Sequence, residues 1–232
     1  MQIKGPDEYL GADPLARAVF FASADVVQQL PKLTRLSGGF CQLHDLRLVH
    51  DGVEAWIDHL LLHRYGFILI ESRTLCVPTL HDKQTRWFQL LGETSREVFS
   101  PVKRVRACAE VVAALLRGWR ETYTWGLDGV PDAEVGVYVS VAEAGELISE
   151  GLGFSSVIVN ARQLTGLLNE RHEQRYLAEV TQRRSGLALS PLGLSTDEVR
   201  LVGQYFLSKH EPLGRGAKYS QSELARYYQA AA

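Results

Sequence analysis

Three residues near the middle of the chain have types and a spacing suited to phosphodiester chemistry. Asp58 stands in an apolar stretch, and Glu71 and Arg73 end the next one. Side chains two positions apart on a strand share a face, and a short turn would bring Asp58 beside them. Two carboxylates offer the oxygen ligands that Mg²⁺ or Mn²⁺ takes, and a guanidinium can stabilise charge developing on phosphorus. The spacing also fits a strand Asp beside a surface Glu–Arg pair.

The elements that must position these residues form a predicted three-stranded meander. Strands are expected over 40–50 and 53–63, because Asp51-Gly52 between them is a two-residue hairpin signal. A turn at 64–66 leads to a third strand over 67–73. The runs Leu-Leu-Leu and Phe-Ile-Leu-Ile inside these strands are typical of strands covered on both faces.

Helices are predicted on either side of the meander. One covers 14–30, and a second begins at Ser100-Pro101 with apolar residues spaced alternately by three and four. Downstream, a strand over 135–141, a short helix over 143–150, a strand over 155–160 and a helix over 161–184 follow. The remaining expectations are a loop over 1–13 and two short strands, 87–91 and 97–99, within an excursion over 74–100. This order predicts an α/β fold with a mixed β-sheet flanked by helices.

The C-terminal part is predicted to be a short helical extension over 195–232, separate from a main domain over 1–185. Two glycines and a proline between 185 and 193 mark a linker. Capping boxes at 195–198 and 220–223 start two short helices. These helices are where a homodimer contact or a protein partner is expected.

Composition bounds the class of protein. The 232 residues carry 25 basic and 27 acidic side chains, a net charge of −2, which excludes a wholly cationic surface but allows a local basic patch. The three cysteines form no C-x-x-C pair, so a cysteine-rich zinc site is not expected. The first residues lack the apolar core of a signal peptide, and no apolar run approaches a membrane span. A cytoplasmic protein without a membrane partner is expected.

Four basic residues are candidate nucleic-acid contacts. Lys103, Arg104 and Arg106 fall largely off the apolar stripe of the Pro101 helix, and Lys83 lies in the excursion before it. Cations on one helix face can contact phosphates. The alternative is an ordinary solvated helix face.

The stretch 57–74, IDHLLLHRYGFILIESRT, resembles the core of the nuclease-related domain (NERD) family. In that family a strand ending in I-D precedes an apolar strand ending in E-x-K, a tryptophan hairpin and a Pro-initiated helix. Trp87 and Pro101 match the last two features, and the likeness extends over roughly residues 20–170. It implies a PD-(D/E)xK restriction-endonuclease-like fold and a metal-dependent endonuclease acting on DNA or, less expected, on RNA. Asp58 and Glu71 would bind Mg²⁺ or Mn²⁺.

Three positions depart from the family pattern. Arg73 replaces its lysine, Arg104 its helix glutamine, and Ser23 the glutamate of its first helix. Arg73 keeps the charge and could stabilise the transition state, but it cannot readily give up a proton; Lys83 could replace the lysine from another direction. Two readings follow. Either the domain is a metal-dependent nuclease, or it is a degenerate module that binds nucleic acid or a protein without cleavage. In the second reading Arg73 pairs with Glu71 or Asp58 and fills the metal position.

Overall fold

The structure is a computed structural model that describes ten stretches of the 232-residue chain. They are residues 1–9, 14–33, 40–73, 79–81, 87–91, 93–123, 134–141, 147–149, 158–185 and 193–212. The predictions for Lys83 and for a helix beginning near residue 220 fall outside these residues. No helix in the described stretches has both the length and the apolar character needed to cross a membrane.

The main sheet has six strands in the order β1-β2-β3-β4-β8-β10. The predicted meander is confirmed, since β2 (Phe40–His50), β3 (Val53–His63) and β4 (Gly66–Arg73) pair antiparallel in sequence order. Strands β8 (Glu134–Val141) and β10 (Ile158–Asn160) then add in parallel. The mixed sheet flanked by helices is therefore confirmed as a restriction-endonuclease-like α/β arrangement.

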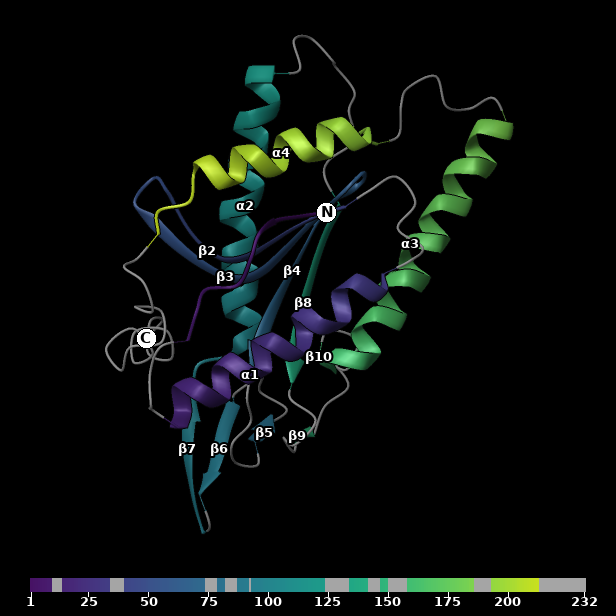
Figure 1. The fold of residues 1–232 in the computed structure, drawn as a ribbon. Coiled ribbons are helices and arrows are strands. Elements are labelled where there is room, and N and C mark those ends of the chain that lie inside the picture. The colour runs from purple at the N-terminus through teal and green to yellow at the C-terminus, as the bar shows by residue number, and fades with distance from the viewer. Residues whose placement is uncertain are drawn as a thin grey trace.

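Helices cover both faces of this sheet (Figure 1). On one face α1 (Pro14–Gln29) and α3 (Ala161–Arg184) pack, and on the other α2 (Pro101–Tyr123) and α4 (Thr196–Ser208). The alternation along β4 makes this possible, because successive side chains point to opposite faces. The α1 and α3 core includes Val26, Leu61, Ile70, Leu164 and Leu168. The α2 and α4 core includes Phe67, Leu69, Val105, Val112 and Phe206.

A second, four-stranded sheet lies beyond the C-terminal ends of β4 and β8 (Figure 1). Its order is β7-β6-β5-β9, with bounds Thr94–Val98, Trp87–Leu91, Thr79–His81 and Leu147–Ser149. The helix predicted over 143–150 is wrong at 147–149, because these residues pair in parallel with β5. Strand pairing overrides a weak local helix pattern. The strand expected over 97–99 lies earlier, at Thr94–Val98.

The loop predicted over 1–13 is wrong at its start, where β1 (Gln2–Lys4) pairs in parallel with β2. The amino group of Met1 donates to the Phe40 carbonyl at 2.7 Å. A three-residue edge strand is too short to show periodicity. Helix α4 packs so closely on β1 that a Cβ at Gly203 would lie 2.3 Å from Ile3 Cδ1. Helix α4 therefore shares the core of the main sheet, and the boundary at residue 185 stays a prediction.

Candidate functional site

Asp58 lies where the β3–β4 ladder ends. The ladder runs from the His63–Gly66 pair to the His59–Ile70 pair. One residue further, the Ser72 backbone N–H donates to Asp58 Oδ2 at 2.8 Å, so a side chain takes over the role of the missing strand partner. The strands separate here, and Asp58 is held beside the segment 71–73. The predicted proximity of Asp58 to this segment is therefore found.

The separation begins one strand earlier, at Asp45. His44 pairs with His59 and Leu46 with Ile57, but the ladder skips Asp45 opposite Asp58. Asp45 has a φ of 51°, a left-handed conformation that Asp adopts more readily than most residues. This local inversion turns both aspartates out of the regular alternation. Sequence periodicity did not reveal it, and Asp45 was missed.

Glu71 is the centre of a buried cluster of charged side chains. Its Oε1 accepts from Arg73 Nη2 at 2.8 Å and also from Arg104 Nη1. Arg104 Nη2 further donates to the Trp56 carbonyl at 3.0 Å. Glu71, Arg73 and Arg104 are all buried, at 2%, 7% and 8% exposure. Arg73 thus makes the ion pair expected of the degenerate reading.

Arg104 does not lie on the solvated helix face that the apolar stripe predicts. Position 104 starts a second row on α2, continued by buried Cys108, Val111 and Leu115. These residues are spaced by four and three, so they form one face of a helix. The buried side of α2 is therefore wider than the first stripe, and this second spacing was the available signal.

The thiol next to this cluster is structural. Cys108 Sγ donates to the Trp56 carbonyl at 3.4 Å. Burial raises the pKa of Cys108 to about 11, and the positive charge of Arg104 opposes that rise only in part. A thiol that stays protonated at neutral pH is a poor nucleophile.

A chain of buried polar groups backs the site on the other face of the sheet. His44 Nδ1 and His59 Nδ1 are 2.8 Å apart, and His59 Nε2 lies 2.6 Å from Ser72 Oγ. All three residues are at most 1% exposed. This chain holds Ser72, whose N–H in turn fixes Asp58. The sequence did not reveal His44 and Ser72 as the partners of His59, because both contacts join different strands.

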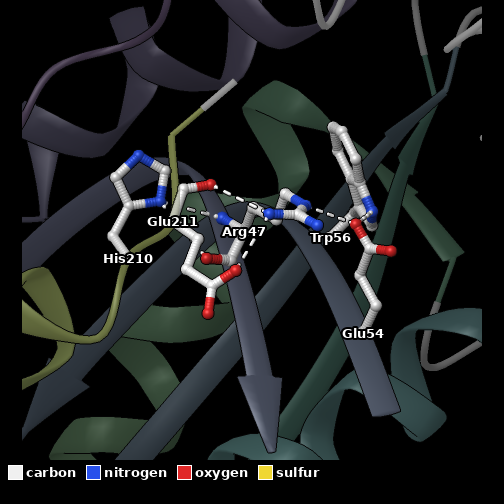
Figure 2. Close-up of polar contacts among 5 residues, drawn as sticks. All are labelled: Arg47, Glu54, Trp56, His210 and Glu211. Atoms are coloured by element: carbon white, nitrogen blue, oxygen red, sulfur yellow. Dashed lines mark hydrogen bonds and ion pairs between the residues drawn. The ribbon is translucent and has the colours of Figure 1, made fainter. Parts of the chain in front are cut away.

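A small pocket opens beside Asp58, with Asp7, Asp45, Arg47 and His210 in its lining. Figure 2 shows His210 and Glu211, which directly follow α4, in contact with Arg47. The Arg47 N–H donates to His210 Nδ1 at 3.1 Å, and its guanidinium donates to Glu211 Oε2 at 3.1 Å. Burial lowers the pKa of His210, and Lys4 lowers it further. His210 and Glu211, directly after α4, are thereby held against β2.

The arrangement does not fit a divalent cation. A metal ligand needs an exposed lone pair, but Glu71 Oε1 already faces two guanidinium groups. Ser23, at the position of the family glutamate, is buried on α1, and its Oγ has no hydrogen-bond partner in the described chain. Across the described stretches no three His, Cys, Asp or Glu side chains form a group able to hold a metal ion.

The remaining predicted contacts lie on the same helix. Lys103 and Arg106 are exposed on the first turns of α2, next to buried Arg104. Being three apart, they share one helix face. Their contact with nucleic acid stays a prediction, as does that of Arg104.

Comparisons with known proteins place the chain in one family. The model of the nuclease-related domain (NERD) matches residues 20–135, half of the chain. Neither the curated proteins nor the solved structures give a significant match. The matched residues contain Asp58, Glu71, Arg73 and all of α2. The chain belongs to the nuclease-related domain family.

Proposed function

We propose that this chain is a nuclease-related domain that binds nucleic acid without cutting it. The observation that carries the proposal is the Glu71 carboxylate, whose Oε1 accepts from both Arg73 and Arg104. Each arginine stands at a position where the family pattern has another residue. The two departures converge on one oxygen atom, so they act together.

Charge balance supports this proposal. The two guanidinium groups carry a formal charge of +2, the same as a divalent cation, at the Glu71 carboxylate. A metal ion entering this site would meet fixed positive charge at close range in a buried environment, where repulsion is weakly screened. Displacing one guanidinium would leave a buried charge without its partner, a cost of about 3–5 kcal/mol.

The nucleic-acid contact is proposed for the exposed face of α2. Lys103 and Arg106 project to solvent close to the N-terminus of this helix, where the helix dipole also favours phosphate. Binding of this kind depends on salt and not on metal, because each phosphate contact releases counterions. The domain would then read phosphates beside a nuclease centre that is closed.

The test combines cleavage and binding on the full chain. Linear, supercoiled and single-stranded DNA, and RNA, are incubated with Mg²⁺, Mn²⁺ or EDTA, and binding is measured by fluorescence anisotropy. We expect no cleavage, and an affinity that is equal with EDTA and with metal at matched ionic strength. In the variant Lys103→Ala/Arg106→Ala, log K should fall less steeply with log salt concentration, the slope being smaller in magnitude by about 2.

Arg117→Ala provides a matched control, because this exposed arginine lies four turns further along α2. It should leave the slope nearly unchanged. Metal-dependent cleavage that disappears in Asp58→Asn would overturn the proposal and establish the metal-dependent nuclease instead. An affinity that requires Mg²⁺ would contradict it as well.

A further inference from the structure

A second pocket lies at the opposite end of the main sheet from Glu71. It is formed where the β3–β4 turn and the first residues of β4 and β8 meet α3. The floor is apolar, made by Ile68, Gly136 and Leu168, and a Cβ at Gly136 would come within 3.0 Å of Ile68 Cγ1. The floor is therefore closely fitted, and a side chain at 136 would require Ile68 to shift.

The polar lining of this pocket is cationic or neutral. Arg171, Arg175, His63 and His172 supply it, together with Tyr65, and no carboxylate is among the described residues that line it. Arg171 and Arg175 stand one helical turn apart and are exposed, whereas both histidines are buried. The pocket beside Asp58 has three aspartates instead. The two ends of the sheet thus present opposite chemistry.

One acid near this cluster, Glu179, is held behind Tyr65. Buried Glu179 accepts from Tyr65 Oη at 2.5 Å, from Arg64 Nη2 at 3.1 Å and from Arg183 Nη2 at 2.6 Å. It therefore fixes the tyrosine that forms one wall. Arg175 lies over the Tyr65 ring at 5.5 Å from its centroid, which orients this guanidinium by a cation–π contact.

The protonation state of the His63 ring follows from its hydrogen bond. His63 Nδ1 accepts a hydrogen bond from the Tyr65 backbone N–H at 3.3 Å, so the neutral ring carries its proton on Nε2. Burial lowers the pKa of His63 to about 3, and the positive charges of His172 and Arg171 add to this effect. The pocket thus has a positive local field, with the Nε2–H donor of His63 below two guanidinium groups.

We propose that this pocket binds a phosphate group. The Arg171 and Arg175 guanidiniums contact its oxygens, which match their planar donor geometry, and the apolar floor excludes water from the other side. The enclosed part of the pocket is small, about 20 Å³, so a phosphate group would sit in its open mouth between the two guanidinium groups, and a whole nucleotide would not be enclosed. This site is separate from the proposed α2 contact.

The first experiment measures inorganic phosphate binding to the full chain by isothermal titration calorimetry, with chloride at equal ionic strength as reference. We expect saturable binding that is at least about tenfold weaker in Arg171→Gln/Arg175→Gln, because this variant removes two charge-assisted hydrogen-bond donors. The matched control is Arg162→Gln/Arg184→Gln, with the same charge change on exposed residues of α3. It should bind within about twofold of the parent.

A readout from inside the pocket checks the location. The ring signals of His63 and His172 in NMR spectra should shift with phosphate and give the same dissociation constant. Arg175→Gln alone keeps the test decisive if the double variant is unfolded, because Arg171 retains its hydrogen bond to Tyr138 Oη. Equal affinity in the pocket and control variants, or no saturable binding, would overturn the proposal.

The last arm identifies the source of the phosphate. A 5′-phosphorylated oligonucleotide is compared with its 5′-hydroxyl form. Tighter binding of the phosphorylated form that is lost in the pocket variant, but kept in Lys103→Ala/Arg106→Ala, assigns the pocket to nucleic-acid ends. Equal binding of both forms, with inorganic phosphate still bound, assigns it to small phosphates. Both results support the site and leave the α2 proposal to its own test.

Discussion

Two buried glutamates of this chain each bind two arginines, at opposite ends of the same sheet. Glu71 contacts Arg73 and Arg104, whose side chains are both 9% exposed. Glu179 contacts Arg64 and Arg183, whose side chains are 22% and 57% exposed. The chemical groups are the same, but the covering differs, because α2 closes over Glu71 and its arginines, whereas the arginines that contact Glu179 are partly in solvent. The first cluster is closed, and the second borders an open pocket.

Burial raises the cost of removing one charge from a cluster. In the closed cluster each charge depends on its partners, since water cannot replace them. In the open cluster water can solvate an arginine that loses its acid. The same substitution should therefore lower the free energy of unfolding much more in the cluster around Glu71 than in the cluster around Glu179.

Glu71→Gln should have the largest effect, because it leaves two buried guanidiniums facing a neutral amide. We expect a loss of about 4 kcal/mol in the free energy of unfolding, measured by urea denaturation. The matched variant Glu71→Leu/Arg104→Leu removes both members of one pair. This double variant should lose less free energy of unfolding than Glu71→Gln does. A larger loss would show that the ion pair itself stabilises the fold.

Arg104→Gln introduces the residue of the family pattern and should cost about 3 kcal/mol, since Arg73 still balances Glu71. The Trp56 carbonyl also loses its donor. Urea denaturation measures the change. Arg106→Gln, two residues along the same helix but exposed, is the control and should change stability by less than about 0.5 kcal/mol. A similar value for both would contradict the closed cluster.

His63 should make stability depend on pH. Its pKa of about 3 in the folded chain is below the ordinary 6.5, so the unfolded chain takes up the proton first as pH falls. The stabilisation by the neutral ring is complete above about 6.5 and is lost toward 3, at about 1.4 kcal/mol per pH unit. Charged and titratable groups of α3 and of the turn face it: Arg171, His172, Arg175 and Tyr65.

The measurement compares urea denaturation of the parent and of His63→Asn between about pH 4.5 and 6.5. Asparagine keeps an acceptor for the Tyr65 N–H but does not titrate. The parent should show the steeper dependence. Parallel curves would mean that His63 is protonated in the folded chain and that its surroundings are not as positive as the geometry indicates.

Arg183→Gln should have the smallest effect, about 0.5 kcal/mol, because this arginine is exposed and Glu179 retains Arg64 and Tyr65. Thermal unfolding at low and high salt measures it, and salt should reduce the difference further. A loss as large as that of Arg104→Gln would remove the contrast between the two clusters.

Much of the fold is readable from sequence because its signals are local. Asp51-Gly52 requires a tight hairpin turn, and the apolar runs around it specify strands covered on both faces. Pro101 starts a helix whose spacing is regular. The placement of Asp58 beside residues 71–73 follows from these elements and from the two-residue period of strands. Short elements such as β1 and β9 escaped, because three residues carry no period and their pairing partners are distant in sequence.

The charged residues near the strand ends can be read directly from the amino-acid sequence, as can the departures of Arg73, Arg104 and Ser23 from the family pattern. The fold is needed to see that Arg104 reaches across 33 positions to the oxygen atom that Arg73 also contacts. It likewise decided that Glu179 meets the β3–β4 turn through Tyr65. Local propensity depends on neighbours in the chain, whereas an ion pair depends on which helix covers which sheet face, and that is set by packing of the whole core.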